Sequence, residues 1–253
     1  MSFAIDWWWP LQEEINTEFG FSKSREEVSS RLISRLYQPK GNLPKIILNN
    51  IVTIVGAGIS EKEIIPDGIK IAADGAVSAC LERNIIPDII VTDLDGILPE
   101  MVWANKKGSK IVVHAHGDNL SRLFEFSNEI QAISLTTTYP YSGTNCWGGF
   151  TDGDRSLMMS LGLGAKSVSL IGFNFDKIGE VKYDAQNISK EKFFDFSIDK
   201  NALDVIEEGP YIISTCNPEN FSKFRDDLEL EFGEPKKSEL IWKAKNPIKL
   251  EPD

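Results

Sequence analysis

Two carboxylates one residue apart, Asp93 and Asp95, follow the apolar run IIPDII in the segment VTDLDG. Side chains of an extended strand alternate in direction, so both carboxylates point to the same side if the run continues to Gly96. Adjacent carboxylates repel each other, and burial adds to that cost, whereas a hard divalent cation removes both problems. Because Mg²⁺ is typically bound by one or two carboxylates together with substrate phosphates, the spacing predicts a magnesium site here. A helix cap followed by a solvated acid is the competing interpretation.

Glycines, acids and histidines also gather at the ends of other apolar runs. These ends are VGAG (55–58), AADGA (72–76), HAHGDN (114–119) and IGFNF (171–175). In doubly wound sheets, ligands bind outside the carboxyl ends of the strands, so polar residues placed there are candidates for a binding site. We expect Asp118 to be a further metal ligand or a nearby acid, and Asp74 to hold metal or ribose.

Gly56 and Gly58 would allow the backbone to approach a nucleotide phosphate closely. Glu61 stands where a dinucleotide fingerprint requires a third glycine, so an ordinary strand-to-loop turn is the alternative. His114 and His116 are the only two histidines. Either histidine is a candidate for contacting phosphate or transferring a proton, and a hydrogen-bonded histidine near a strand end is the alternative for both. His116 is the one that we expect at the binding site.

A glycine-rich loop precedes a predicted helix in the stretch GTNCWGGFTDGDRS (143–156). Four of its residues are expected to contact the ligand: Gly143, Thr144, Asn145 and Asp152. Thr151 or Asp152 can cap the helix. Arg155 can meet a phosphate, although a solvated arginine is the commoner case.

The elements that must position these residues alternate along the chain from about residue 44 to 176. The apolar runs cover residues 50–58, 68–76, 87–96, 109–118, 129–138 and 165–175, with helical patterns between them. Strands that are apolar on both faces and alternate with helices indicate a parallel sheet covered by helices on both sides. The sequence therefore predicts an α/β fold with a doubly wound, mainly parallel, Rossmann-like sheet.

Two further segments flank this predicted core. Residues 1–43 predict an N-terminal helical segment, with Ser24 capping its second helix and the aromatic run DWWWP packing between helices rather than against a ligand ring. Residues 177–253 predict a C-terminal extension that packs on the core. We expect it to contain a helix at about 187–208 and a short strand at YIIST (211–215).

Composition excludes several classes of protein. The net charge of -11 argues against broad nucleic-acid binding, which needs a basic footprint. The three cysteines are far apart and form no CxxC pair, which predicts reduced thiols rather than a zinc knuckle or a disulfide frame. No apolar run has the length of a membrane span, and the N-terminus lacks the cationic start of a secretory signal. We expect a cytoplasmic protein without nucleic-acid or membrane partners; a homodimer is compatible with the sequence, which does not fix the oligomeric state.

Together, these motifs resemble a known family. AADGAVSACLERNIIPDIIVTDLDGI (72–97) resembles thiamin pyrophosphokinase-type catalytic domains, in which an Asp-Gly pair precedes a proline-aspartate and an Asp-x-Asp strand end. TDGDRSLMMSLGLGAKSVSLIGF (151–173) is similar to the later Thr-Asp helix and strand of those domains. HAHGDN, the N-terminal DWWW…FGFS stretch and GEVKYD (179–184) resemble the archaeal 6-hydroxymethyl-7,8-dihydropterin pyrophosphokinase branch, the MptE-like proteins. The resemblance spans about residues 5–185.

The resemblance implies transfer of diphosphate from ATP to the hydroxymethyl group of a small pterin, with Mg²⁺ required and AMP released, in folate or methanopterin synthesis. It implies that the metal-binding and catalytic acids are Asp93, Asp95 and Asp118. The residues expected around nucleotide or pterin are Gly56, Gly58, Asp74, Gly75, His116, Gly143, Thr144, Asn145 and Asp152. Two positions depart from the expected pattern. Gly96 stands where thiamin enzymes usually have serine, which weakens a thiamin assignment, and Asp184 replaces a serine expected in GEVKYD.

Other activities remain open at the level of sequence. Transfer to thiamin or another alcohol would use the same acids, and a DxD glycosyltransferase would use a cation to hold the diphosphate of a nucleotide sugar. A nicotinamide-binding oxidoreductase would use VGAG and Asp74, although the missing third glycine and the surplus acids argue against it. A nucleotide sensor would bind ATP without turning over an acceptor.

Overall fold

The computed structural model describes residues 8–19, 21–60, 62–96, 98–173 and 240–241. In this part of the chain, parallel strands form one seven-stranded sheet in the order β5-β4-β3-β2-β1-β6-β7. The strands are β1 (Ile51–Val55), β2 (Ile69–Ala73), β3 (Ile89–Thr92), β4 (Lys110–Ala115), β5 (Ala132–Thr137), β6 (Ser167–Ile171) and β7 (Leu240–Ile241). Because every pairing is parallel, the carboxyl ends of all the strands lie at one edge of the sheet.

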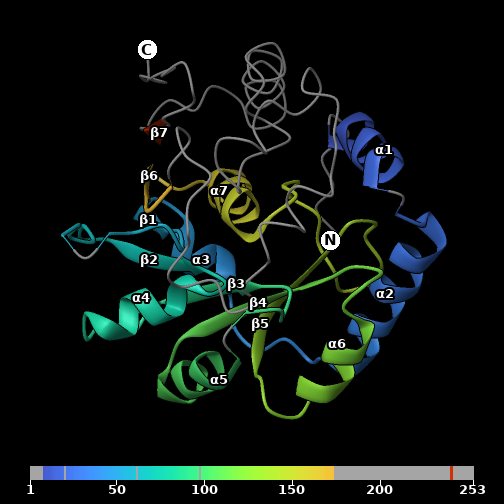
Figure 1. Cartoon of the computed structure of the whole chain (residues 1–253), viewed down its shortest axis with the longest axis horizontal. Coiled ribbons are helices and arrows are strands. Elements are labelled where there is room, and N and C mark those ends of the chain that lie inside the picture. The colour runs from blue at the N-terminus through green and yellow to red at the C-terminus, as the bar shows by residue number, and fades with distance from the viewer. Residues whose placement is uncertain (1–7, 20, 61, 97, 174–239, 242–253) are drawn as a thin grey trace.

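Helices cover both faces of this sheet (Figure 1). One face carries α2 (Lys23–Leu36), α4 (Ala76–Glu82), α5 (Leu98–Lys107) and α6 (Leu120–Phe126). The other face carries α1 (Trp8–Phe19), α3 (Leu43–Ile47) and α7 (Asp152–Gly162). None of the helices in the described ranges has the length and apolarity needed to cross a bilayer.

The strand order explains which helix lies on which face. The strands β1 to β5 are laid down side by side in one direction, so right-handed crossovers put α4, α5 and α6 on the same face. The chain then returns across the sheet to place β6 beside β1, and the same handedness puts α7 on the opposite face. As a result α7 packs across β1, β2, β3 and β6.

The sheet divides the hydrophobic core into two layers. In β1, Val52 and Ile54 pack in the layer that includes α7, whereas Val55 packs in the layer that includes α4. In β3, Val91 and Ile90 are divided between the two layers in the same way. Because both layers are apolar, the strands appear in the sequence as nearly continuous hydrophobic runs.

The doubly wound α/β fold predicted from the sequence is confirmed. All six predicted strands are present but shorter than the apolar runs, because the polar residues at their carboxyl ends leave the hydrogen-bonded ladder. The strand β7, which pairs with β6 at Val168 and Leu240, was not predicted. The assignment of Ser24 as a helix cap is wrong, since α2 begins at Lys23 with Ser22 as its N-cap. The helix predicted at 187–208 and the strand at 211–215 lie outside the described residues.

Candidate active site

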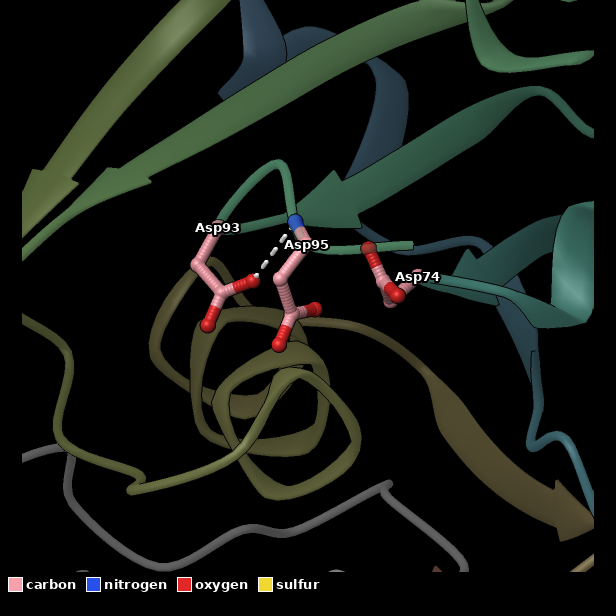
Figure 2. Close-up of side chains that lie close together, drawn as sticks. All are labelled: Asp74, Asp93 and Asp95. Carbon is pink, nitrogen blue, oxygen red and sulfur yellow. Dashed lines mark hydrogen bonds between the residues drawn. The ribbon is translucent and has the colours of Figure 1, made fainter. Parts of the chain in front are cut away.

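Three carboxylates converge at the carboxyl ends of β2 and β3 (Figure 2). Asp74 directly follows β2, while Asp93 and Asp95 follow β3. Each of the three offers one oxygen atom, and these atoms all lie within 4.8 Å of one another. Since β2 and β3 are parallel neighbours, their ends lie at the same edge of the sheet. The fold thus brings together acids that lie about twenty residues apart in the sequence.

The two acids of VTDLDG meet through a turn rather than along a strand. The strand β3 ends at Thr92, and Leu94 has a φ of 70°, in the left-handed region. The backbone N–H of Asp95 donates a hydrogen bond to Asp93 Oδ1 at 3.2 Å, which closes a local turn. The expectation that an extended run to Gly96 would align the carboxylates is therefore wrong, although the two side chains do come together.

Asp74 is fixed by the residues on either side of that turn. Thr92 Oγ1 donates to Asp74 Oδ1 at 2.7 Å and accepts from the backbone N–H of Leu94 at 2.8 Å, so one hydroxyl joins the acid to the turn. A Cβ atom added at Gly96 would overlap the Asp74 carboxylate. The glycine of DLDG is therefore a steric requirement of this arrangement.

Burial and mutual repulsion shift the pKa values of these acids in opposite directions. Burial, together with the charge on Asp93, raises the pKa of Asp74 to about 7. Burial and the charges of Asp93 and Asp74 raise the pKa of Asp95 to about 10. Burial also acts to raise the pKa of Asp93, but the hydrogen bond and charge of His116 outweigh it and hold the pKa below its ordinary value. Without a cation, the cluster therefore retains a proton on Asp95 at neutral pH.

This set of residues fits a hard divalent cation. Carboxylate oxygens are the ligands that Mg²⁺ takes in proteins, and three of them lie within reach of a common point. A cation at that point would favour the ionised forms of Asp74 and Asp95, whose repulsion otherwise makes ionisation costly. The site can therefore exchange a proton for a metal ion.

His116 and Asn119 join the end of β4 to this cluster. His116 Nε2 lies 3.4 Å from Asp93 Oδ2. The buried amide of Asn119 donates to the carbonyl oxygens of Asp93 at 2.7 Å and His114 at 2.8 Å, and it accepts from the backbone N–H of His116 at 3.1 Å. All three bonds fix the spacing between the ends of β3 and β4. A role for Asn119 was not predicted, although asparagine just before a helix is a typical capping residue.

His114 is buried beside the site, and its ring stacks on that of His116 with the ring centroids 6.0 Å apart. It is 5% exposed, and burial, together with the charge of Arg155, lowers the pKa of its imidazole well below the ordinary value. His114 is therefore neutral at physiological pH. Its Nδ1 is buried without a hydrogen-bond partner among the described residues.

A buried ion pair at the start of α7 lies close to the acid cluster. Arg155 Nη1 lies 2.5 Å from Asp152 Oδ1, and Arg155 Nη2 donates to the carbonyl of Phe150 at 2.9 Å. Burial and the charge of Asp93 raise the pKa of Asp152 well above its ordinary value, while Arg155 opposes this shift. Arg155 is only 3% exposed, so a solvated arginine is excluded. The positive charge of Arg155 instead acts on the buried acids, because it lowers the pKa of both Asp93 and Asp152.

Asp154 has a local structural role in the same turn. Its carboxylate accepts hydrogen bonds from the backbone N–H groups of Phe150 at 2.8 Å and Thr151 at 2.6 Å. Thr151 is the N-cap of α7, as one of the two sequence alternatives had it. These contacts fix the first turn of the helix and leave Asp152 as the acid that faces the cluster.

The structure places Asp118 outside the cluster of three. Its carboxylate lies 3.3 Å from Arg25 Nη1 of α2, and its side chain is 54% exposed. Asp118 follows His116 by two residues, so it lies near the site without sharing the point at which the other three carboxylates meet. Its predicted role as a ligand or catalytic acid stays a prediction.

Gly56 and Gly58 pack against the backbone at Gly172, directly after the end of β6. A Cβ atom at either glycine would lie 2.8 Å from the carbonyl oxygen of Gly172. The backbone N–H of Gly56 donates to Ile171 at 2.8 Å, and that of Gly58 donates to Gly172 at 3.0 Å. Both amides are therefore used within the protein, and the close approach that these glycines allow is between two strand ends. Their contact with a nucleotide stays a prediction.

The loop at Gly143, Thr144 and Asn145 is tied to the end of β5. Thr144 Oγ1 accepts from the backbone N–H of Tyr141 at 2.7 Å, and the N–H of Asn145 donates to the carbonyl of Leu135 at 2.9 Å. Gly143 has a φ of 83° and open space around it. Gly143 of this loop is therefore exposed to solvent, whereas Thr144 is buried.

Gly75, at the start of α4, donates its backbone N–H to the Asp74 carboxylate.

The aromatic run at the start of α1 packs as predicted at Trp8. This side chain is 1% exposed, donates its Nε1–H to Gln12 at 3.0 Å and covers the backbone of Gly148. Trp9 stacks on Tyr139 with ring centroids 5.4 Å apart. Trp7 lies outside the described residues.

Comparisons with known proteins identify one family over most of the chain. Residues 41–180 match the family model "6-hydroxymethylpterin diphosphokinase MptE-like". A 6-hydroxymethyl-7,8-dihydropterin pyrophosphokinase of Pyrococcus furiosus is 38% identical over 68% of this chain and 78% of its own length. Proteins with the same name from Methanocaldococcus jannaschii and Methanothermobacter thermautotrophicus are 37% and 34% identical over 73% and 68% of this chain, and 85% and 78% of their own lengths.

The C-terminal part of the chain matches a different family model. Residues 155–253 match the "TACO1/YebC second and third domain", which overlaps the first match at 155–180. A probable transcriptional regulatory protein of Wolbachia pipientis is 34% identical over 83 residues, which is 32% of this chain and 33% of that relative. A similar protein from a Wolbachia of Brugia malayi is 32% identical over the same share. The chain thus spans about a third of the length of these relatives.

Proposed function

Since the chain belongs to the MptE-like family of 6-hydroxymethylpterin diphosphokinases, we propose that it transfers diphosphate from ATP to the hydroxymethyl group of 6-hydroxymethyl-7,8-dihydropterin. The observation that carries this proposal is the meeting of Asp74, Asp93 and Asp95 at the ends of two neighbouring strands. Transfer of diphosphate to an alcohol requires neutralisation of the negative charge on the polyphosphate, and this acid cluster is the place in the described structure where a cation can be held.

The reaction is an in-line attack of the pterin hydroxyl oxygen on the β-phosphorus of ATP. The new O–P bond forms as the bond from the β-phosphorus to the oxygen bridging to the α-phosphate breaks, AMP leaves, and the hydroxyl proton is lost to a base or solvent. Most of the catalytic effect in such reactions comes from positioning and from electrostatic stabilisation. Bound Mg²⁺ supplies charge neutralisation of the phosphates.

The protein's own residues would divide this work. Asp74, Asp93 and Asp95 would hold the cation, and His116 would keep the Asp93 carboxylate ionised and oriented. Arg155 would add a fixed positive charge near the acid cluster, because its guanidinium is held on α7 by Asp152 and the Phe150 carbonyl, and the raised pKa of Asp152 favours the neutral acid. Such a rigid charge stabilises a developing negative charge without reorganisation during the reaction.

Incubation of the purified chain with ATP, Mg²⁺ and 6-hydroxymethyl-7,8-dihydropterin tests the proposal. We expect equal amounts of AMP and pterin diphosphate, separated by ion-exchange chromatography, and no product with EDTA. Parallel reactions with thiamin and without an acceptor identify the alcohol that is used. AMP formation with thiamin alone, or no AMP with either alcohol while a control kinase is active, would contradict the assignment.

A further inference from the structure

The N-terminal helix α2 contacts the loop that carries His116. Glu26 of α2 is only 4% exposed, and its Oε1 accepts a hydrogen bond from the backbone N–H of Gly117 at 2.7 Å. This bond joins residues 91 positions apart in the sequence. The helix lies before residues 41–180, which match the family model, so the contact comes from outside the matched core.

Close packing supports the same contact. A Cβ atom at Gly117 would lie 2.9 Å from Arg25 Cβ and 2.9 Å from Glu26 Oε1. The loop can therefore approach α2 this closely only with glycine at this position. Arg25 adds an exposed ion pair to Asp118, which is expected to contribute little by itself.

The loop connects Glu26 to the acid cluster through His116. The backbone N–H of Asp118 donates to His116 Nδ1 at 3.3 Å, so this nitrogen acts as an acceptor. Nε2 then carries the proton that faces Asp93, and it lies 3.4 Å from Asp93 Oδ2. The position of the Gly117–Asp118 backbone thus determines how His116 is presented to Asp93.

Glu26 is a costly choice if its role is only packing. Its second carboxylate oxygen, Oε2, is buried and has no hydrogen-bond partner among the described residues. A buried carboxylate with an unsatisfied oxygen destabilises the fold, whereas an apolar side chain of similar size would not. A requirement for the Oε1 acceptor would explain the presence of a glutamate here.

We propose that Glu26 is a positioning residue, which holds the loop at Gly117 so that His116 orients the Asp93 carboxylate for cation binding. This inference rests on the proposed cation site. Loss of the acceptor would leave the acids in place but misorient one of them. The expected effect is therefore weaker cation binding in a chain that remains folded.

Two substitutions at position 26 separate positioning from packing. Glu26→Met keeps the side-chain volume and removes the acceptor, whereas Glu26→Gln keeps an oxygen that can accept from Gly117. Mn²⁺ binding to the metal-free full chain, measured by electron paramagnetic resonance without nucleotide, gives a readout independent of turnover. Because changes to groups that orient metal ligands typically weaken binding by about 10- to 100-fold, we expect Glu26→Met to weaken it about 3- to 10-fold at this greater remove. Glu26→Gln should stay within about twofold of the unchanged chain.

Glu27→Ala is the matched control, because Glu27 is the adjacent acid on α2 and is partly exposed. We expect it to leave Mn²⁺ binding unchanged. Thermal unfolding should show Glu26→Met folded at the assay temperature, because relief of the unsatisfied Oε2 offsets the loss of the acceptor for the Gly117 N–H. Should Glu26→Met fail to fold, Gly117→Ala replaces it, since the added Cβ pushes the loop from α2 and should weaken Mn²⁺ binding similarly.

Unchanged Mn²⁺ affinity in a folded Glu26→Met or Gly117→Ala chain would overturn the inference alone. Equal weakening by Glu26→Gln and Glu26→Met would also overturn it, because the acceptor would then be irrelevant. Absence of Mn²⁺ binding in the unchanged chain would instead overturn both the cation site and the role of Glu26.

Discussion

At the scale of single residues, the proposed cation site depends on carboxyl groups that are buried where ionisation is unfavourable. Asp95 illustrates this, because burial and two neighbouring carboxylates raise its pKa to about 10. Such a residue reduces the stability of the fold without a cation, and its ionisation becomes favourable when a cation neutralises its neighbours. Replacing its carboxyl group by an amide should therefore lower activity and raise the stability of the metal-free chain.

Asp93→Asn and Asp95→Asn should each lower the rate of AMP formation by at least about 100-fold, because a ligand to the proposed cation is lost. Without Mg²⁺ at pH 8, Asp95→Asn should raise the free energy of unfolding by about 1 kcal/mol or more, since no proton must be taken up on folding. That gain corresponds to a rise in Tm of roughly 2–4 °C. Asp67→Asn, a change at an exposed acid before β2, is the control for both measurements. Near-normal turnover in both site variants would refute the cation assignment.

Asp118→Asn distinguishes the sequence expectation from the geometry. Its carboxylate is half-exposed and paired with Arg25, so the geometry predicts a fall in rate of less than about threefold. A fall as large as that of Asp93→Asn would show that Asp118 joins the other acids when substrate is bound. Steady-state rates at saturating ATP and Mg²⁺ make this comparison.

Gly96→Ala should damage the site by steric overlap with Asp74. We expect a loss of about 1–3 kcal/mol in the free energy of unfolding, typical of overpacking, together with an increased Mg²⁺ requirement. Gly108→Ala provides a comparison, because Gly108 has open space around it and any loss there comes from its positive φ alone. Equal Mg²⁺ requirements for Gly96→Ala and the unchanged chain would contradict the proposed contact.

At the scale of elements, turns rather than strands determine how the acids meet. Alternation along an extended strand predicted that Asp93 and Asp95 would converge. They do converge, but through a turn, since the backbone of Leu94 is in the left-handed region. A non-glycine residue in that conformation is uncommon, so the sequence offered no basis for predicting it. Asn119 was missed for a related reason: its three hydrogen bonds join two strand ends that only the tertiary fold brings together.

The first turn of α7 offers a test at this scale. A Cβ atom at Gly149, whose φ is 91°, would lie 2.5 Å from the backbone N of Arg155. Gly149→Ala should therefore destabilise the protein by about 1–3 kcal/mol and displace the Asp152–Arg155 pair. Circular dichroism melts would measure the stability, and kcat would fall more than the KM for ATP changes if the pair acts in the transition state. A variant with normal stability and kcat would show that the turn can relax without consequence.

At the scale of the whole molecule, the pattern of apolar runs was sufficient to predict the doubly wound fold. Alternating buried strands and helices leave few arrangements once crossovers are right-handed. The edge strand β7 escaped prediction because its two residues come from far along the chain and carry no periodic pattern. The overlap of two family matches at 155–180, which includes most of α7 and all of β6, could not be inferred from residue patterns either.

The stability of the metal-free chain should decrease as pH rises. Asp74 has a folded pKa of about 7 and Asp154 about 6, both above their ordinary value, so their contribution is complete below about pH 4 and is lost as pH rises through the folded values. The opposite contribution of Asp93 is constant above pH 5, because its folded pKa is lowered. Buried His114, whose pKa is lowered, opposes this fall only below about pH 7. We therefore expect Tm in EDTA to fall between pH 7 and 8.5, where the raised pKa values of Asp74 and Asp95 still act, and Mg²⁺ to raise Tm more at pH 8.5.

Asp74→Asn supplies the control for this pH dependence. It should reduce the fall in Tm in EDTA, because one of the groups that releases a proton is gone. It should also abolish most of the Mg²⁺ effect. A Tm in EDTA that rises over the same range, with or without the substitution, would contradict the assigned pKa shifts.

The close contact between Gly96 and Asp74 also bears on how related enzymes could diverge. A serine at position 96, as in thiamin-type motifs, cannot be accepted while Asp74 keeps its present rotamer and its left-handed backbone. Because thiamin-type motifs keep the Asp-Gly pair, accommodating the serine would take a shift of the aspartate side chain and not its replacement. The residue at position 96 would thus set the direction in which this carboxylate points.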